Sequence, residues 1–307
     1  MRRGLVSMFT GGLLVAGCTT ADRPVASAPN FAHVQDLDGV PDMIVDAKAL
    51  ATSWVVYDQQ VREDNCSLQE ANLVPGQYRF LRFTVNTPNI GTADIFIGDP
   101  NRHWDPNGDG DGSDSDGLFE NNACHRHYHF RNYALYQLIA QDGTITKARK
   151  NGFCMIDVAP YNDGAPPKSW VYRACGRPAR PDLGLPEVPG NQGISVGYAD
   201  QYYKWLVGQY FVLNDPNAAL VPPGTYTLRI WVNPPFTPKS KNDLCPTKDA
   251  AGFCHMFRES NYDNNIGQVV ITIPEHPGKT GYGPGSGSTP PSDVFIVDTE
   301  DRPSSDK

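Results

Sequence analysis

The segment VPPGTYTLRIWVN, residues 221–233, begins with a proline–glycine turn and continues with apolar residues at alternate positions. A period of two is typical of a β-strand with one buried face. Five other short runs share this pattern: YRFLRFTVN at 78–86, TADIFIG at 92–98, HYHFRNYALYQLIA at 127–140, GQYFVLND at 208–215 and GQVVITI at 267–273. Because turn-forming residues separate the runs, we expect a mainly β protein: an antiparallel β-sandwich or barrel core with long loops and few short helices.

The first residues, MRRGLVSMFTGGLLVAGC, have a basic head, a short apolar run and small residues before a cysteine. The pattern predicts a secretory signal at 1–17, because the apolar run is too short to span a bilayer. Val15 to Cys18 resemble the lipobox of bacterial lipoproteins, which implies lipidation of Cys18 and anchoring in the cell envelope. Thr19 and Thr20 offer no aspartate for inner-membrane retention, which favours the outer membrane. The alternative is an ordinary signal peptide and a secreted protein.

The remaining chain has the composition of a globular protein, with 39% hydrophobic and 20% charged residues. Its length suits one large domain or two small ones. Residues 18–36 are predicted to form a tether, and residues 276–307, rich in Gly, Ser and Pro, a flexible tail. The folded domain is therefore expected at 37–275. The net charge of −8 argues against nucleic acid as a partner.

Cysteine usage points to an oxidising compartment. The chain has 7 cysteines, and an even number remains once Cys18 is set aside. Outside the cytoplasm such a set favours disulfides over free thiols. Cys245 and Cys254 are near enough in sequence for a local bridge.

Three histidines, His125, His127 and His129, occupy alternate positions in the run CHRHYHF. On a strand, residues at this spacing project from one face. Imidazole nitrogen suits copper, zinc, iron and nickel, and three histidines with an open fourth position indicate a reactive metal site. The alternative is a polar strand face whose histidines bind water or backbone groups.

A loop rich in oxygen ligands, DPNGDGDGSDSD, precedes the histidines. Its spacing fits the EF-hand calcium loop, except that aspartate replaces the final glutamate. The alternative is a hydrophilic loop with no ion. The expected ligands are Asp105, Asn107, Asp109, Asp111, Ser113 and Asp116.

Five motifs together resemble the catalytic domain of lysyl oxidases, which are copper amine oxidases with a lysine tyrosylquinone cofactor. They are CHRHYH, KNGFC, GISVGYADQYY, VPPGTYTLRIWVNP and ESNYDNN, and the resemblance covers about residues 41 to 273. It implies that the three histidines bind copper, and that Lys150 and Tyr202 crosslink to form the quinone. Asp200, two residues before Tyr202, is implied as the base that removes the substrate's α-proton.

The implied reaction converts a primary amine, molecular oxygen and water into an aldehyde, ammonia and hydrogen peroxide. The sequence does not say whether the amine is a protein lysine, a peptide or a small polyamine. Two other classes stay open: a calcium-stabilised metal-binding or adhesion module without redox activity, and a zinc hydrolase that uses the three histidines and water.

The resemblance also implies a second calcium site that ties the start of the domain to its end. Asn261 stands where the family usually has aspartate. The implied ligands are Asp42, the carbonyl of Met43, Glu259, Asn261, Asn264 and Asn265.

The chain departs from the family in several places. Arg149 and Asn122 each replace a family histidine, and the acidic loop is an insertion. Cys124 and Cys175 match a family disulfide, which by elimination suggests that Cys66 pairs with Cys154.

Overall fold

The computed structural model describes residues 39–287, with gaps at 64–65, 67, 69–70, 110, 123, 151, 162–170, 207 and 239–243. These residues all belong to one compact unit, which begins at Gln35. The predicted signal peptide, the lipidation site at Cys18 and the whole of the tether lie outside the described residues, as does the tail after residue 287. Within the described part of the chain, no helix is long and apolar enough to cross a membrane.

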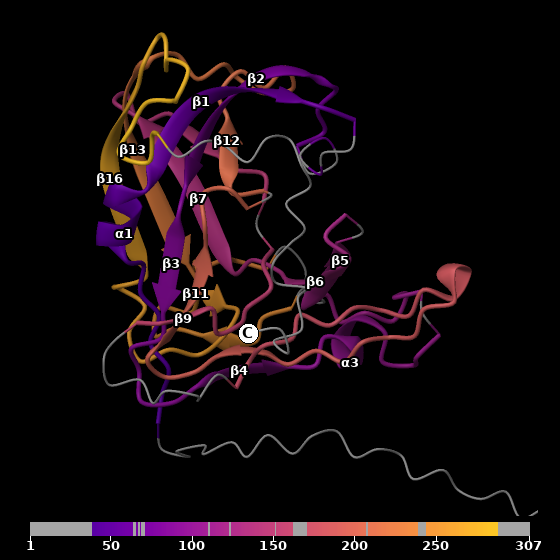
Figure 1. Cartoon of the computed structure of the whole chain (residues 1–307). Coiled ribbons are helices and arrows are strands. Elements are labelled where there is room, and N and C mark those ends of the chain that lie inside the picture. The colour runs from indigo at the N-terminus through magenta and orange to yellow at the C-terminus, as the bar shows by residue number, and fades with distance from the viewer. Residues whose placement is uncertain are drawn as a thin grey trace, which may run out of the picture. The chain divides into compact units, whose positions relative to one another are not determined.

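A four-stranded antiparallel sheet forms one layer of the domain (Figure 1), in the order β16, β13, β7, β8. Its strands are β16 (Ile266–Ile273), β13 (Gly224–Val232), β7 (Ala134–Ala140) and β8 (Ile145–Lys147). Tyr226, Leu228, Ile230 and Val232 are buried along β13, while the residues between them are at least partly exposed. The strand predicted from residues 221–233 is therefore confirmed, with its apolar positions facing the core.

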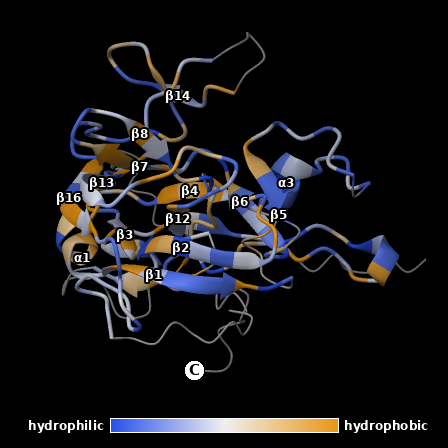
Figure 2. Cartoon of the chain, turned by 90° about the horizontal axis from the view of Figure 1, so that it is seen from above, coloured by the Kyte–Doolittle hydropathy of each residue, from blue (hydrophilic) through white to orange (hydrophobic). Residues whose placement is uncertain are grey.

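A second antiparallel sheet contains β1 (Trp54–Val61), β2 (Gly76–Phe83) and β12 (Tyr210–Val212), in the order β1, β2, β12. Phe83 of β2 packs edge-on against Tyr136 of β7, with ring centroids 5.2 Å apart. Side chains from both sheets meet in one apolar core. The expected antiparallel sandwich is thus present, and Figure 2 shows hydrophobic and hydrophilic residues interspersed along its strands.

Along the sequence, short helices and small strand pairs connect the strands of the two larger sheets, as expected of a β protein with long loops. The helices placed in full within the described residues are α1 (Ala47–Thr52), α3 (Asn101–Trp104) and the 3-10 turn η1 (Pro181–Leu183). The paired strands are β3 (Val85–Pro88) and β9 (Ala159–Pro160) on either side of β11 (Tyr198–Tyr202), β4 (Ile95–Gly98) with β10 (Gln192–Ile194), β5 (Phe119–Asn122) with β6 (His127–Phe130), and β14 (Thr247–Lys248) with β15 (Cys254–His255).

Three disulfides crosslink the domain: Cys66–Cys124, Cys154–Cys175 and Cys245–Cys254. The local bridge predicted within residues 245–254 is confirmed. The two pairings taken from the resemblance and by elimination, Cys124 with Cys175 and Cys66 with Cys154, are wrong.

The backbone around β6 explains the observed pairing. Backbone groups of β6 hydrogen-bond to Phe153 and, two residues earlier, to the carbonyl of Gly176. Cys154 and Cys175 are the chain neighbours of these residues, and their Cα atoms lie 5.4 Å apart. Cys124 instead sits in the turn that precedes β6, where it meets Cys66.

The first part of the predicted flexible tail is folded against β1. Tyr282 and Val56 exchange two backbone hydrogen bonds of 2.8 Å, and the N–H of Gly285 donates to the carbonyl of Trp54 at 2.9 Å. At Gly283, where φ is +126°, a Cβ would lie 2.6 Å from the Trp54 ring, so only glycine permits this approach. The expectation of a flexible tail from residue 276 is therefore wrong up to residue 287.

Candidate metal centre with an adjacent lysine and tyrosine

The three histidines come together as a group with the geometry to hold a metal ion. One ring nitrogen from each of His125, His127 and His129 lies within 4.8 Å of the others, and all three residues are buried. The strand prediction holds for His127 and His129, which belong to β6, but it is wrong for His125. Arg126 has a φ of +61°, so the chain turns there before the strand begins. The cluster therefore combines two strand residues with one turn residue.

Asn122, at the end of β5, fixes that turn. Its Oδ1 accepts the backbone N–H groups of Cys124 and His125 at 3.1 and 3.0 Å, and its carbonyl accepts the N–H of Arg126 at 2.8 Å. Asparagine often stabilises a turn by bonding to backbone groups two or three residues ahead. The sequence shows Asn122 only as a departure from the family's histidine, whereas its structural role is to orient His125.

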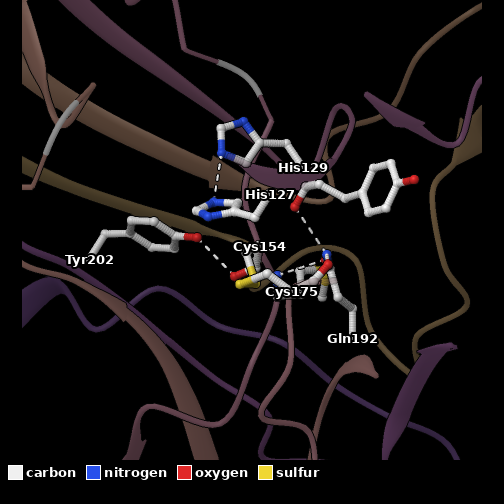
Figure 3. Close-up of a disulfide and its surroundings, with 8 residues drawn as sticks. His127, His129, Cys154, Cys175, Gln192 and Tyr202 are labelled. Atoms are coloured by element: carbon white, nitrogen blue, oxygen red, sulfur yellow. Dashed lines mark hydrogen bonds between the residues drawn. A yellow bond between two sulfur atoms is a disulfide. The ribbon is translucent and has the colours of Figure 1, made fainter. Parts of the chain in front are cut away.

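The imidazoles are close-packed and shielded from water. The Nε2 atoms of His127 and His129 lie 3.2 Å apart, and their ring centroids 5.0 Å apart (Figure 3). Burial, followed by the positive charge of Lys150, lowers the pKa of His129 well below its ordinary value. Oε1 of Glu120 lies 3.6 Å from Nδ1 of His129, a neighbour that sequence analysis missed. Burial therefore favours the neutral form of His129, which is the form that binds a metal.

Lys150 and Tyr202 lie beside this cluster. The Nζ of Lys150 is 5.2 Å from the ring centroid of Tyr202 and 5.2 Å from that of Phe153. The ring of Phe153 packs edge-on against Tyr202, with centroids 4.9 Å apart. The hydroxyl of Tyr202 donates to the carbonyl of Cys154 at 2.8 Å (Figure 3). Two residues separated by more than fifty positions are thus brought together with defined orientations.

The residues around Phe153 connect the lysine to the histidines. Phe153 and Phe130 exchange backbone hydrogen bonds of 2.7 and 3.0 Å, so the segment after Lys150 pairs with β6. Gly152 lies at the closest approach: a Cβ there would be 2.7 Å from Oε1 of Glu120 and 3.1 Å from Cβ of His129. A larger residue at position 152 would displace the Glu120 carboxylate and press against His129, so glycine lets the lysine loop pass close to the cluster without moving these side chains.

Asp200 lies on β11, two residues before Tyr202, so both side chains project from the same face of that strand. Asp200 is fully buried, and the hydroxyl of Thr87 donates to its backbone carbonyl at 3.1 Å. Its charge adds to the effect of burial in raising the pKa of Tyr133.

A family model for lysyl oxidase matches residues 41–243, about two thirds of the chain. The chain belongs to the lysyl oxidase family. Human protein-lysine 6-oxidase is 24% identical over 255 residues, covering 78% of this chain and 47% of the relative. Zebrafish lysyl oxidase homolog 3A is 27% identical over 224 residues, covering 69% of this chain and 25% of the relative. Human lysyl oxidase homolog 3 is 29% identical over 182 residues, covering 57% of this chain and 19% of the relative. The chain therefore spans less than half the length of each of these relatives.

The acidic loop, which this lysyl oxidase family member carries before the histidines, is held by its own hydrogen bonds. Asp105, Asn107, Asp109 and Asp111 each accept backbone N–H groups within the loop at 2.7–3.1 Å. Asp116, the twelfth position, instead pairs with Nδ1 of His103 at 2.8 Å. Among the described residues, the histidines are the group of three or more His, Cys, Asp or Glu side chains close enough to hold an ion. Calcium binding by the loop stays a prediction.

The second predicted calcium cluster is assembled from both ends of the domain. Oε2 of Glu259 accepts the N–H of Met43 at 2.6 Å, and Nδ2 of Asn264 donates to Asp42 at 3.0 Å. Burial raises the pKa of Glu259 to about 7. Within the described residues, the buried Oδ1 atoms of Asn264 and Asn265 have no hydrogen-bond partner.

The remaining asparagine predicted for this cluster, Asn261, is used locally, because its Oδ1 accepts the N–H of Asp263 at 3.0 Å. Two buried oxygens that lack donors fit a hard cation, which binds carbonyl and carboxylate oxygens. Whether calcium binds there stays a prediction.

Proposed function

We propose that this protein is a copper-dependent amine oxidase that converts primary amines to aldehydes and releases ammonia and hydrogen peroxide. The observation that carries the proposal is the position of Lys150, whose Nζ lies 5.2 Å from the ring centroid of Tyr202 beside three buried histidines. Family membership supports the same activity. The substrate class would be protein lysine, a peptide or a small polyamine, with molecular oxygen as the second substrate.

The histidine cluster fits copper. Three buried imidazole nitrogens suit copper, and burial favours the neutral, metal-binding form of His129. Copper, when bound, would supply with oxygen the oxidising chemistry that converts a tyrosine ring to a quinone. The ligands would be His125, His127 and His129.

The chain's own residues would orient the crosslink. The carbonyl of Cys154 holds the hydroxyl of Tyr202, and the edge of the Phe153 ring fixes the tyrosine plane. Burial of Tyr202 excludes water from the reacting ring. Nζ of Lys150, once neutral, would then form the bond to that ring, giving lysine tyrosylquinone.

Asp200 is the candidate base. It is buried on the strand face that also presents Tyr202, and its carboxylate would take the α-proton of an amine bound at the quinone. Calcium at the Glu259 cluster and in the acidic loop would be structural.

We also propose that lipidated Cys18 anchors the protein in the bacterial cell envelope, on the outer membrane. If the signal peptide is cut later, the protein would instead be secreted.

Metal content and activity of one histidine variant test this proposal. His127→Ala should lose both copper, measured by atomic absorption, and amine oxidation, measured as hydrogen peroxide release. His276→Ala is the matched control, because His276 is an exposed histidine outside the cluster. Full copper occupancy in His127→Ala, or activity that depends on zinc instead, would contradict the proposal.

A further inference from the structure

The loop that carries Lys150 is anchored at each end. On one side, the N–H of Ala148 donates to the carbonyl of Tyr136 in β7 at 3.1 Å. On the other side, Phe153 pairs with Phe130 of β6. These backbone bonds fix residues 148 and 153, the two ends of the segment that contains Lys150.

Arg149 makes such a contact with Asp215. Nε and Nη2 of Arg149 both donate to Oδ2 of Asp215, at 3.1 and 2.6 Å. The side chain of Asp215 is 5% exposed and that of Arg149 is 39% exposed, so the pair is half-shielded from water. Oδ1 of Asp215 accepts the N–H of Asn217 at 2.8 Å, which holds the carboxylate in place. The guanidinium is therefore bound to a rigid acceptor.

The two neighbouring cations of the loop have separate partners. Arg149 bonds to Asp215, which follows β12 in the second sheet, while Lys150 lies over the rings of Phe153 and Tyr202. With the guanidinium fixed on one side, the backbone at residue 149 is restrained and the next side chain is directed to the rings. A misplacement of about 1 Å at a reacting group can cost about a hundredfold in rate.

We propose that Arg149 and Asp215 are positioning residues, which hold Lys150 over Tyr202 so that the crosslink can form. This inference rests on the proposed function. In that crosslinking, the Tyr202 ring takes one oxygen atom from O₂, whose other atom leaves as water. The Nζ–carbon bond then replaces a ring C–H bond, and a second O₂ takes up the released two electrons and two protons as hydrogen peroxide.

The rate of crosslinking in the full mature chain tests the proposal. Protein produced without copper is given copper and oxygen, and joined peptides from residues 150 and 202 are quantified by mass spectrometry. Arg149→Gln and Asp215→Asn should each form the crosslink about tenfold more slowly, with unchanged copper content. Arg149→Lys, which keeps the charge, should recover part of the rate. Arg180→Gln is the control, because Arg180 makes a similar 2.9 Å pair with Asp182 on the surface.

A purely stabilising pair would give a different result: a lower melting temperature in Arg149→Gln and Asp215→Asn, but a crosslinking rate equal to that of the wild type. That result would overturn the proposal. If the wild type forms no crosslink at all, the proposed function fails, and the position of the lysine needs a second measurement.

That second measurement uses copper-free protein. Lysines carrying isotope-labelled dimethyl groups keep their charge, and the Lys150 signal, assigned from Lys150→Arg, should show a ring-current shift because the amine lies over two aromatic rings. Arg149→Gln and Asp215→Asn should lose this shift, while Arg180→Gln keeps it. Retention of the shift in both variants would overturn the positioning role.

Discussion

At the scale of single residues, the candidate site depends on side chains that the sequence pattern does not single out. The alternation at 125–129 predicted that the three histidines lie together, but one of them reaches the cluster from a turn with a positive φ at Arg126. Asn122 and Gly152 shape the site through a hydrogen-bonded turn and a close approach. Such roles depend on backbone geometry in three dimensions, which hydrophobic periodicity does not record.

Asn122→Ala should destabilise the protein and weaken copper binding. The substitution leaves two partly buried N–H groups, those of Cys124 and His125, without their acceptor. This costs about 1–3 kcal/mol, or roughly 2–4 °C in melting temperature per kcal/mol for a domain of this size. Calorimetry and copper titration measure the two effects. Asn122→Asp keeps the acceptor oxygen and should remain close to wild type; equal loss in both variants would contradict the capping role.

At the scale of secondary structure, alternation predicted the long strands of the sandwich, including β13 and β16. Pairing between distant elements was not predictable, because it depends on which segments meet in space. The cysteines show this: β6 brings the neighbours of Cys154 and Cys175 side by side, so the pairing that the resemblance implied is wrong. The prediction of a flexible tail, made from composition, was also wrong for the segment from residue 276 to 287. Its glycines allow the backbone to pack closely against β1 rather than making it flexible.

Removal of that segment should lower stability. A chain ending at His276 lacks the two backbone bonds between Tyr282 and Val56 and the bond from Gly285 to Trp54. The tilted contact of the Tyr282 and Trp54 rings, 6.2 Å apart, is also lost. A chain ending at Gly287 keeps all of these and is the control. Thermal unfolding should show a decrease of several degrees, about 2–4 °C per kcal/mol, only for the shorter chain. Equal melting temperatures would show that the segment adds nothing to stability.

At the scale of the whole domain, residues 41–43 near its start meet residues 259–264 near its end at the Glu259 cluster. The N–H of Ser260 donates to the carbonyl of Pro41 at 2.8 Å, next to the contact between Asn264 and Asp42. If calcium binds there, it closes the domain and stabilises the native state by mass action, by about 2.7 kcal/mol at a hundredfold excess over Kd.

Calcium removal should therefore lower the melting temperature. Adding EGTA to the full mature chain removes the ion, and restoring calcium should reverse the effect. Asp42→Asn should reduce the chelator-sensitive shift if the Glu259 cluster is the site, and Asp109→Asn should reduce it if the acidic loop is the site. A melting temperature that does not respond to EGTA in the wild type would count against both sites.

The central claim is that Lys150 and Tyr202 become one cofactor, and its most direct test is a peptide map of the copper-matured, catalytically active protein. We predict a peptide that joins the two residues, together with absorption of visible light. Both should be absent from Lys150→Arg, since a guanidinium stays protonated and cannot add to the ring, and from Tyr202→Phe, which lacks the phenolic oxygen. Active enzyme in which both residues are found unmodified would contradict the claim.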